Sequence, residues 1–258
     1  MYNFCVHMYI FDVSFYSLRI APTWYGLSYA LGFIICYIFI KSRFSFTKKE
    51  HIDSLLTYTF FWIILGGRIG YAILYNLSFF LEYPLQLLYI WNWGMSFHGW
   101  LIGTIIGVYL FTRRYKYEFW KLIDTLAIVV PIALWLWRIW NWINNELPWY
   151  TPYDGPFAMY ILWIQHFPSP LLEMTLEGII LFLIMILFYK YMKNRNPWFL
   201  SGVFLIGYSI ARIIAEQFRL PDSHIWYIFW TSWLTLWILY TVPMILYGVY
   251  LAIKNFRR

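Results

Sequence analysis

Long apolar stretches that alternate with short basic clusters constrain this chain more than any other feature of its sequence. A helix of about 20 apolar residues can span a bilayer, and seven such stretches can be placed here. Only 12% of the residues are charged, far below the roughly 25% typical of a soluble domain. The sequence therefore predicts an all-α, polytopic integral membrane protein with about seven transmembrane helices. The expected spans lie near residues 22–40, 54–77, 96–112, 122–140, 171–189, 199–217 and 228–252.

The basic clusters predict the orientation of these helices. Fourteen of the nineteen lysines and arginines fall into four clusters that occupy alternate loops. They are Lys41, Arg43, Lys48 and Lys49; Arg113, Arg114, Lys116 and Lys121; Lys190, Lys193 and Arg195; and Lys254, Arg257 and Arg258. Because cytoplasmic loops are enriched in lysine and arginine, we expect the N-terminus outside and the C-terminus in the cytoplasm.

The loops on the expected outer side are long, aromatic and rich in proline. They cover residues 78–95 and 141–170. Aromatic rings favour the headgroup level of a membrane, so we expect these segments to be partly interfacial, with short helices on the outer leaflet. No internal repeat or soluble domain boundary interrupts the chain, which predicts a single transmembrane domain over residues 1–258.

Several classes of function are disfavoured by composition and motifs. The net charge of +7 lies in juxtamembrane clusters rather than on one basic face, which argues against binding of nucleic acid. Cys5 and Cys36 are too few and too differently placed for a disulfide framework or a metal site. No cluster has metal-ligand spacing, and no phosphate loop or nucleophile motif is present. We expect neither a metal nor an organic cofactor.

Three arginines, Arg68, Arg138 and Arg212, lie inside the apolar stretches. A charged side chain near the bilayer centre costs about 2.5–3.5 kcal/mol on insertion scales, so such residues imply polar partners or a charged ligand. The planar fork of donors on arginine suits phosphate or carboxylate groups. We expect Arg68 to balance one of the carboxylates inside the membrane.

Charged residues also share helical faces. Tyr208, Arg212 and Glu216 recur every four residues, so their side chains project from one stripe that must line a cavity or another helix. Glu173 and Glu177 form a similar pair. The two glutamates could act as acid and base, but pairing with the arginines is the favoured interpretation.

Two further positions have both a functional and a structural interpretation. Arg138 and Asn141 share a helix face near the outer end, where Arg138 either binds a ligand or pairs with a carboxylate that holds helices together. His98 could act as a base near neutral pH, or its ring could be satisfied by water or a carbonyl. The glycines Gly99, Gly103 and Gly107 favour close helix packing.

Taken together, these segments resemble the bacterial prolipoprotein diacylglyceryl transferase family over nearly the whole chain. The resemblance implies transfer of the diacylglyceryl group from phosphatidylglycerol to the cysteine thiol in the lipobox of a prolipoprotein signal peptide, with release of glycerol phosphate. It also implies a multi-pass protein of the bacterial cytoplasmic (inner) membrane. The motifs that carry it are Trp24–Leu27, Gly67–Tyr71, Gly94–Gly99, Arg138–Glu146, Pro168–Ser169, Leu176–Gly178, Tyr208–Asp222 and Pro243–Met244.

The resemblance implies roles for the polar residues. Arg138 and Arg212 would grip the phosphate of the lipid donor and stabilise the departing glycerol phosphate. A thiol is a weak nucleophile until it loses its proton, so a base is needed, and His98 is expected to be that base, with Tyr208 as rival or relay. The residues expected to position these groups or contact the headgroup are Asn141, Glu146, Glu216 and Tyr25.

Seven tryptophans stand where the family pattern leads us to expect glycine. They are Trp93, Trp100, Trp135, Trp137, Trp140, Trp149 and Trp237. Placing indole rings at packed glycine positions forces strain, since even modest overpacking costs about 1–3 kcal/mol. One hypothesis is that these positions are UGA codons that the source reads as glycine; the other is a lineage with a truly aromatic site.

Two other functions stay open at this point. A non-catalytic membrane protein could use the buried arginines to bind an anion or a lipid, or to transport it. An inactive homologue would result if the tryptophans filled the catalytic cavity.

Overall fold

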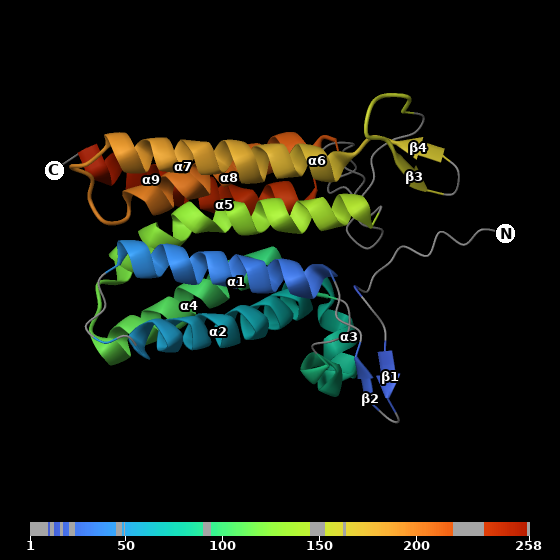
Figure 1. Ribbon diagram of the computed structural model, residues 1–258, viewed down its shortest axis with the longest axis horizontal. Coiled ribbons are helices and arrows are strands. Elements are labelled where there is room, and N and C mark those ends of the chain that lie inside the picture. The colour runs from blue at the N-terminus through green and yellow to red at the C-terminus, as the bar shows by residue number, and fades with distance from the viewer. Residues whose placement is uncertain are drawn as a thin grey trace. The chain divides into compact units, whose positions relative to one another are not determined.

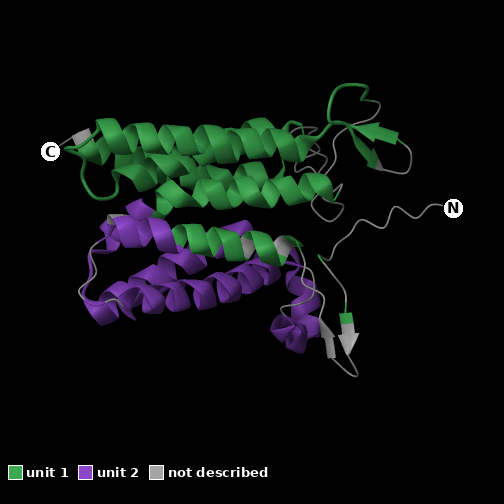
Figure 2. Ribbon diagram, in the orientation of Figure 1, with its two compact units in different colours: residues 1–36, 126–258 green, residues 37–125 purple. Residues whose placement is uncertain are grey.

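The computed structural model describes residues 10, 13–15, 18–20, 24–44, 48, 50–89, 94–144, 153–161, 164–218 and 235–256. The chain divides into two compact units, shown in different colours in Figure 2. Unit 1 comprises residues 1–36 and 126–258, and unit 2 comprises residues 37–125. Each unit is described by itself below.

Each of the seven predicted apolar stretches contains a helix in the described part of the chain (Figure 1). The helices are α1 (Trp24–Arg43), α2 (Glu50–Tyr75), α4 (Phe97–Tyr115), α5 (Phe119–Ile143), the continuous run of α6 (Ser169–Glu173), η2 (Met174–Ile180) and α7 (Leu181–Tyr191), α8 (Phe199–Glu216) and α9 (Leu236–Phe256). The prediction of helices at these places is confirmed.

Five of these helical segments are long and apolar enough to cross a membrane, judged by length and composition among the described residues. They are Glu50–Tyr75, Phe119–Ile143, Ser169–Tyr191, Phe199–Glu216 and Trp237–Asn255. Helix α1 contributes a shorter apolar run, Gly26–Ser42. The chain is therefore a helical, polytopic membrane protein.

In unit 2, helices α2 and α4 lie side by side and approach closely at glycines (Figure 1). A Cβ added to Gly66 would lie 2.9 Å from the Cα of Gly103, and one added to Gly107 would lie 2.9 Å from the carbonyl oxygen of Tyr58. A Cβ on Gly70 would lie 2.7 Å from the Cα of Gly99. The close packing predicted for the three glycines of α4 is confirmed, and it brings two backbones together as small residues do in membranes.

In unit 1, helix α8 packs against α9 and against the segment α6–η2–α7. The core between them is built from Met185, Leu200, Phe204 and Leu251, all of which are nearly fully buried. Large apolar side chains also point outward from the same helices, and they include Leu183, Leu187, Ile210, Leu246 and Tyr250. Such extensive apolar exposure is typical of a surface that faces lipid.

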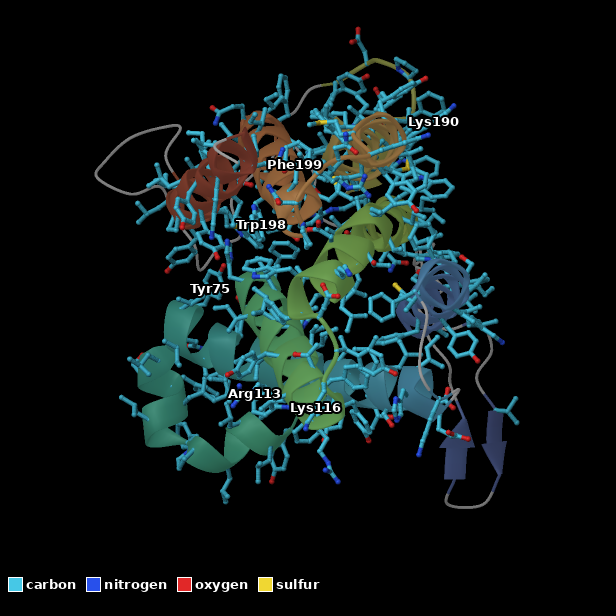
Figure 3. All side chains as sticks on the ribbon, turned by 90° about the vertical axis from the view of Figure 1, so that its left-hand side faces the viewer. Tyr75, Arg113, Lys116, Lys190, Trp198 and Phe199 are labelled. Atoms are coloured by element: carbon cyan, nitrogen blue, oxygen red, sulfur yellow. The ribbon has the colours of Figure 1, made fainter. Side chains whose placement is uncertain are left out.

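The first two basic clusters lie at one end of unit 2. His51 Nδ1, at the start of α2, lies 2.7 Å from Tyr117 Oη, which follows the end of α4. Arg113 is in the last turn of α4, and Lys116 ends that helix in the left-handed conformation with φ 58°. Figure 3 labels both of these basic residues. The cluster before α2 and the cluster after α4 therefore share one end of the unit.

The described residues of the third and fourth clusters likewise lie at one end of unit 1. The backbone N–H of Asn196 donates to Asn255 Oδ1 at 2.8 Å, which ties the α7–α8 connection to the end of α9. Lys254 Nζ lies 4.8 Å from the ring centroid of Trp198. Lys190 is in the last turn of α7, and Figure 3 labels it together with Trp198.

The two long outer segments differ from each other. Residues 78–95 contain short helices, as predicted: α3 (Leu77–Glu82) runs into this segment, and η1 (Pro84–Leu88) lies within it. The described part of 141–170 instead continues α5 and then forms an antiparallel pair, β3 (Met159–Ile161) with β4 (Ile164–His166). In the described residues 153–161 and 164–168 this strand pair stands in place of the expected short helices, because a run rich in β-branched and aromatic residues favours strands. A second antiparallel pair joins β1 (Val13–Phe15) and β2 (Leu18–Ile20).

Candidate active site

A buried network of arginines and glutamates lies inside unit 1. Arg138 Nη1, from α5, is 2.8 Å from Glu173 Oε2, and Arg138 Nη2 is 3.3 Å from Glu177 Oε2. Arg138 Nη1 also donates to Asn141 Oδ1 at 3.3 Å. The predicted sharing of one face by Arg138 and Asn141 is thus realised as a direct hydrogen bond.

Arg212 joins the same two glutamates from helix α8. Its Nη1 donates to Glu173 Oε1 at 2.8 Å and to Glu177 Oε1 at 3.0 Å. Its Nη2 donates to Glu216 Oε2, one turn further along the helix. The predicted pairing of Glu173 and Glu177 with the arginines is confirmed.

The network holds three carboxylates and two guanidinium groups, and all five side chains are buried. Breaking such a buried pair by removing one partner costs about 3–5 kcal/mol, because the remaining charge is left uncompensated. Neither Arg138 Nε nor Arg212 Nε has a hydrogen-bond partner within the described residues. The Nε–H of each arginine is therefore a donor that its glutamates do not use.

The two shared glutamates come from an unusual stretch of helix. Glu173 ends α6, and Glu177 lies in the π-helical segment η2, Met174–Ile180. Short π-helical segments occur frequently at functional sites, because the wider turn re-aims side chains. Here both carboxylates face the arginines of α5 and α8. The sequence contains no signal for this local widening.

Thr235, just before helix α9, and Trp237, in its first turn, complete the network. Thr235 was not predicted as a site residue from the sequence. Thr235 Oγ1 donates to Glu216 Oε1 at 3.1 Å. The ring of Trp237 lies 5.2 Å from the guanidinium carbon of Arg212. A threonine just before an apolar run is a helix-start signal that could have marked Thr235.

Tyr208 lies one turn before Arg212 on α8 and is 1% exposed. Its ring stacks on that of Phe204, with the two ring centroids 5.9 Å apart. The predicted stripe of Tyr208, Arg212 and Glu216 therefore faces the interior of unit 1.

His98 belongs to unit 2, where it is the second residue of helix α4 and is buried. Ser96 caps this helix, since its Oγ accepts the N–H of Gly99 at 3.2 Å. The N–H of Ser96 donates to the carbonyl of Gly67 at 3.0 Å, so the start of α4 is tied to α2. His98 is therefore held on a rigid, capped helix end.

Arg68, which was expected to balance a carboxylate, donates to backbone carbonyls. Its guanidinium donates to the carbonyl oxygens of Gln86 at 2.7 Å, Gly94 at 3.1 Å and Leu87 at 3.3 Å. It also lies 5.1 Å from the ring of Phe80. The partners that the structure describes for Arg68 are thus backbone carbonyls of the loop before His98, whereas Glu173 and Glu177 are held by the other two arginines.

Two predicted site residues lie wholly or partly outside the part of the chain that the structure describes. Glu146 lies outside the described residues, and so does the side chain of Tyr25, although its backbone belongs to α1. No group of three or more metal-ligating side chains is found in the part of the chain that the structure describes.

Five of the seven tryptophans at expected glycine positions lie in described segments, and Trp100, Trp135 and Trp140 make close contacts there. A Cβ on Gly67 would collide with the ring of Trp100, and one on Gly178 would lie 2.7 Å from the Cβ of Trp135. The ring of Trp140 stacks on Trp24 at 4.5 Å. Trp93 and Trp149 fall outside the described residues.

Comparison with known proteins places this chain in a family. The family model for prolipoprotein diacylglyceryl transferase matches residues 12–254 of the chain. The chain belongs to this family. A protein named phosphatidylglycerol–prolipoprotein diacylglyceryl transferase from Rhizobium leguminosarum bv. trifolii is 37% identical over 270 residues, covering 96% of this chain and 93% of the relative.

Other relatives of the transferase family agree. Proteins of the same name from Rhizobium meliloti and Brucella anthropi are 37% and 35% identical. Each match covers 90% of this chain, with 87% and 86% of the relative. The buried arginine–glutamate network, and His98 in the capped first turn of α4, therefore belong to a membrane-embedded transferase.

Proposed function

We propose that this transferase moves the diacylglyceryl group of phosphatidylglycerol to the cysteine thiol in the lipobox of prolipoprotein signal peptides. The family match over residues 12–254 supports the reaction. The names of the relatives supply the lipid donor and the protein acceptor.

The observation that carries the proposal is the paired arrangement of Arg138 and Arg212. Shared carboxylates hold both guanidinium groups in fixed positions, while Nε of each remains a free donor in the described residues. Arginine N–H groups form strong, directed hydrogen bonds with phosphate oxygens. The two donors would bind the phosphate of the donor lipid and stabilise it as it leaves.

The reaction forms one bond and breaks one. The thiolate sulfur attacks the glyceryl carbon that bears the phosphate ester, the C–S bond forms, and the C–O bond to the phosphate breaks. Glycerol phosphate departs with the electron pair. The thiol proton passes to a base, for which His98 is the first candidate and Tyr208 the second. Asn141 and Glu216 would position the arginines through the contacts described above, and Glu146 and Tyr25 remain candidates for the headgroup.

The membrane topology that we propose has seven transmembrane helices and a single catalytic domain over residues 1–258. Within each unit, the described basic clusters gather at one end, as described above, which supports a cytoplasmic location for that end of each unit. The N-terminus would then lie outside and the C-terminus in the cytoplasm, in the inner membrane of a bacterium.

One observation favours a second candidate function. With three carboxylates against two guanidinium groups, the network has no surplus positive charge to attract a phosphate. An inactive homologue that uses the network only to hold helices together would show this arrangement. A binder or transporter of anions is less favoured, since it would need that surplus charge.

A transfer assay in vesicles separates these candidates. The purified protein is placed in vesicles that contain labelled phosphatidylglycerol, and a lipobox peptide is followed by its gain in mass. We expect product from the unaltered protein and a loss of at least about a hundredfold for Arg212→Lys, because an ammonium cannot reproduce the fork of donors. Lipid binding without product would support a binder, and neither binding nor product would support an inactive homologue.

Two variants sharpen the assay. Arg195→Lys is the matched control, since Arg195 lies at the other end of unit 1 and donates to the carbonyls of Tyr189 and Met192. Its rate should equal that of the unaltered protein. His98→Ala tests the base: lost transfer with retained lipid binding supports His98, whereas an unchanged rate removes it and leaves Tyr208.

A further inference from the structure

A single hydroxyl joins the start of helix α9 to the network. Thr235 is the residue before α9 and is 2% exposed. Its Oγ1 donates to Glu216 Oε1 at 3.1 Å and accepts the N–H of Ile238 at 3.4 Å. Because a hydroxyl has only one hydrogen to donate, that hydrogen is committed to Glu216.

Glu216 in turn holds Arg212. While Oε1 of the carboxylate binds Thr235, its Oε2 accepts from Arg212 Nη2. The positive end of the α9 helix dipole also favours a negative charge at this place. Trp237, in the first turn of α9, lies against the guanidinium of Arg212. The start of α9 therefore contacts both members of the Arg212–Glu216 pair.

We infer that Thr235 is a positioning residue for diacylglyceryl transfer. By fixing the rotation of the Glu216 carboxylate, Thr235 sets the direction in which Arg212 presents its Nε–H to the phosphate. This inference rests on the role proposed above for Arg212. Reacting groups must be held in near-attack geometry, so a small displacement of an orienting group lowers the rate.

Thr235→Val tests the inference because it keeps the shape of the side chain and removes the hydroxyl. We expect kcat to fall about tenfold or more, since the lost hydrogen bond is made to a charged group. Thr235→Ser restores the hydroxyl and should return kcat to within about threefold of the unaltered protein.

Thr241→Val is the matched control. Thr241 is fully buried inside helix α9, but its Oγ1 donates to the carbonyl of Ile238 at 2.7 Å. The Thr241→Val variant should leave kcat unchanged, while it lowers the free energy of unfolding by about as much as Thr235→Val does. Equal kcat for Thr235→Val and Thr241→Val would overturn the inference.

A double-mutant cycle separates positioning from simple capping of α9. In a Glu216→Gln background the hydrogen bond from residue 235 is made to a neutral group and is weaker. Positioning through Glu216 therefore predicts that Thr235→Val costs several-fold less in that background. A purely structural cap would give the same factor in both backgrounds, and that result contradicts the inference.

The inference and the proposed function can fail separately. Full activity of Arg212→Lys would contradict the proposed phosphate site itself. Lost activity of Arg212→Lys together with full activity of Thr235→Val would contradict only the role of Thr235. Should the valine variant fail to fold, Thr235→Ala removes the same hydroxyl without placing a methyl group beside Glu216, and the same comparisons apply.

Discussion

Arg138 and Arg212 bind opposite oxygens of one carboxylate. Glu173 Oε2 lies 2.8 Å from Arg138 Nη1, and Glu173 Oε1 lies 2.8 Å from Arg212 Nη1. One glutamate thereby joins helix α5 to helix α8 and sets the spacing of the two arginines. The stability of unit 1 and the geometry of the proposed phosphate site consequently depend on the same side chain.

Neutralising this carboxylate should destabilise the protein strongly. Glu173→Gln leaves two buried guanidinium groups facing an amide, and we expect the free energy of unfolding to fall by about 3–5 kcal/mol. The melting temperature in detergent measures the effect. Glu118→Gln is the control, because Glu118 pairs with Lys121 at 2.6 Å on an exposed surface and should cost at most about 1 kcal/mol. Equal effects of the two substitutions would contradict a stabilising role for the network.

The sequence predicted the helices and the network for clear physical reasons. Hydropathy over 20 residues is decisive for a membrane helix, so every apolar stretch contains one. The spacing of Glu173 with Glu177, and of Arg212 with Glu216, places each pair on one face, so ion pairing could be expected. A buried charge needs a partner, and few partners exist inside a membrane protein.

Other features depend on contacts that local pattern does not encode. The π-helical segment around Glu177 and the hydrogen bond from Thr235 to Glu216 arise from packing between distant helices. Arg68 donates to the carbonyls of Gln86 and Gly94, which lie far from it along the chain, and spacing along one helix cannot reveal such contacts. The strands at 159–166 occur where proline and aromatic content suggested interfacial helices.

Arg68 should act on the loop before His98 rather than on the phosphate. Arg68→Leu leaves three carbonyl oxygens without this donor, and a buried unsatisfied group costs about 1–3 kcal/mol. We expect faster hydrogen exchange at the described amides of residues 84–96, with a lower rate of transfer. Unchanged exchange in this loop would show that the arginine does not hold it. Arg113→Leu, at the exposed end of α4, is the comparison and should leave this exchange unaltered.

The seven tryptophans give a prediction about the gene. If the source reads UGA as glycine, those seven codons are UGA, whereas the codons for Trp24 and Trp91 are UGG. Protein from the natural source would then have the mass expected for glycine at each of the seven positions. The collision between the Trp100 ring and a Cβ on Gly67 shows how little room this helix contact leaves. UGG at most of the seven codons would instead establish an aromatic site.

Trp198 gives an independent test of where glycine fits this backbone, because its φ is 122°, in a region that side chains rarely adopt. It is not among the seven tryptophans, and it precedes the first residue of α8. Trp198→Gly and Trp198→Ala both remove the ring that contacts Lys254, so their difference isolates the backbone. We expect the glycine variant to be more stable by about 1 kcal/mol or more, because only glycine adopts this conformation without strain.

At Trp62, inside α2, the order should reverse, since alanine is favoured over glycine in a helix interior by about 1 kcal/mol. Melting temperatures of the four variants measure both differences, and an alanine variant more stable than glycine at position 198 would contradict the strain.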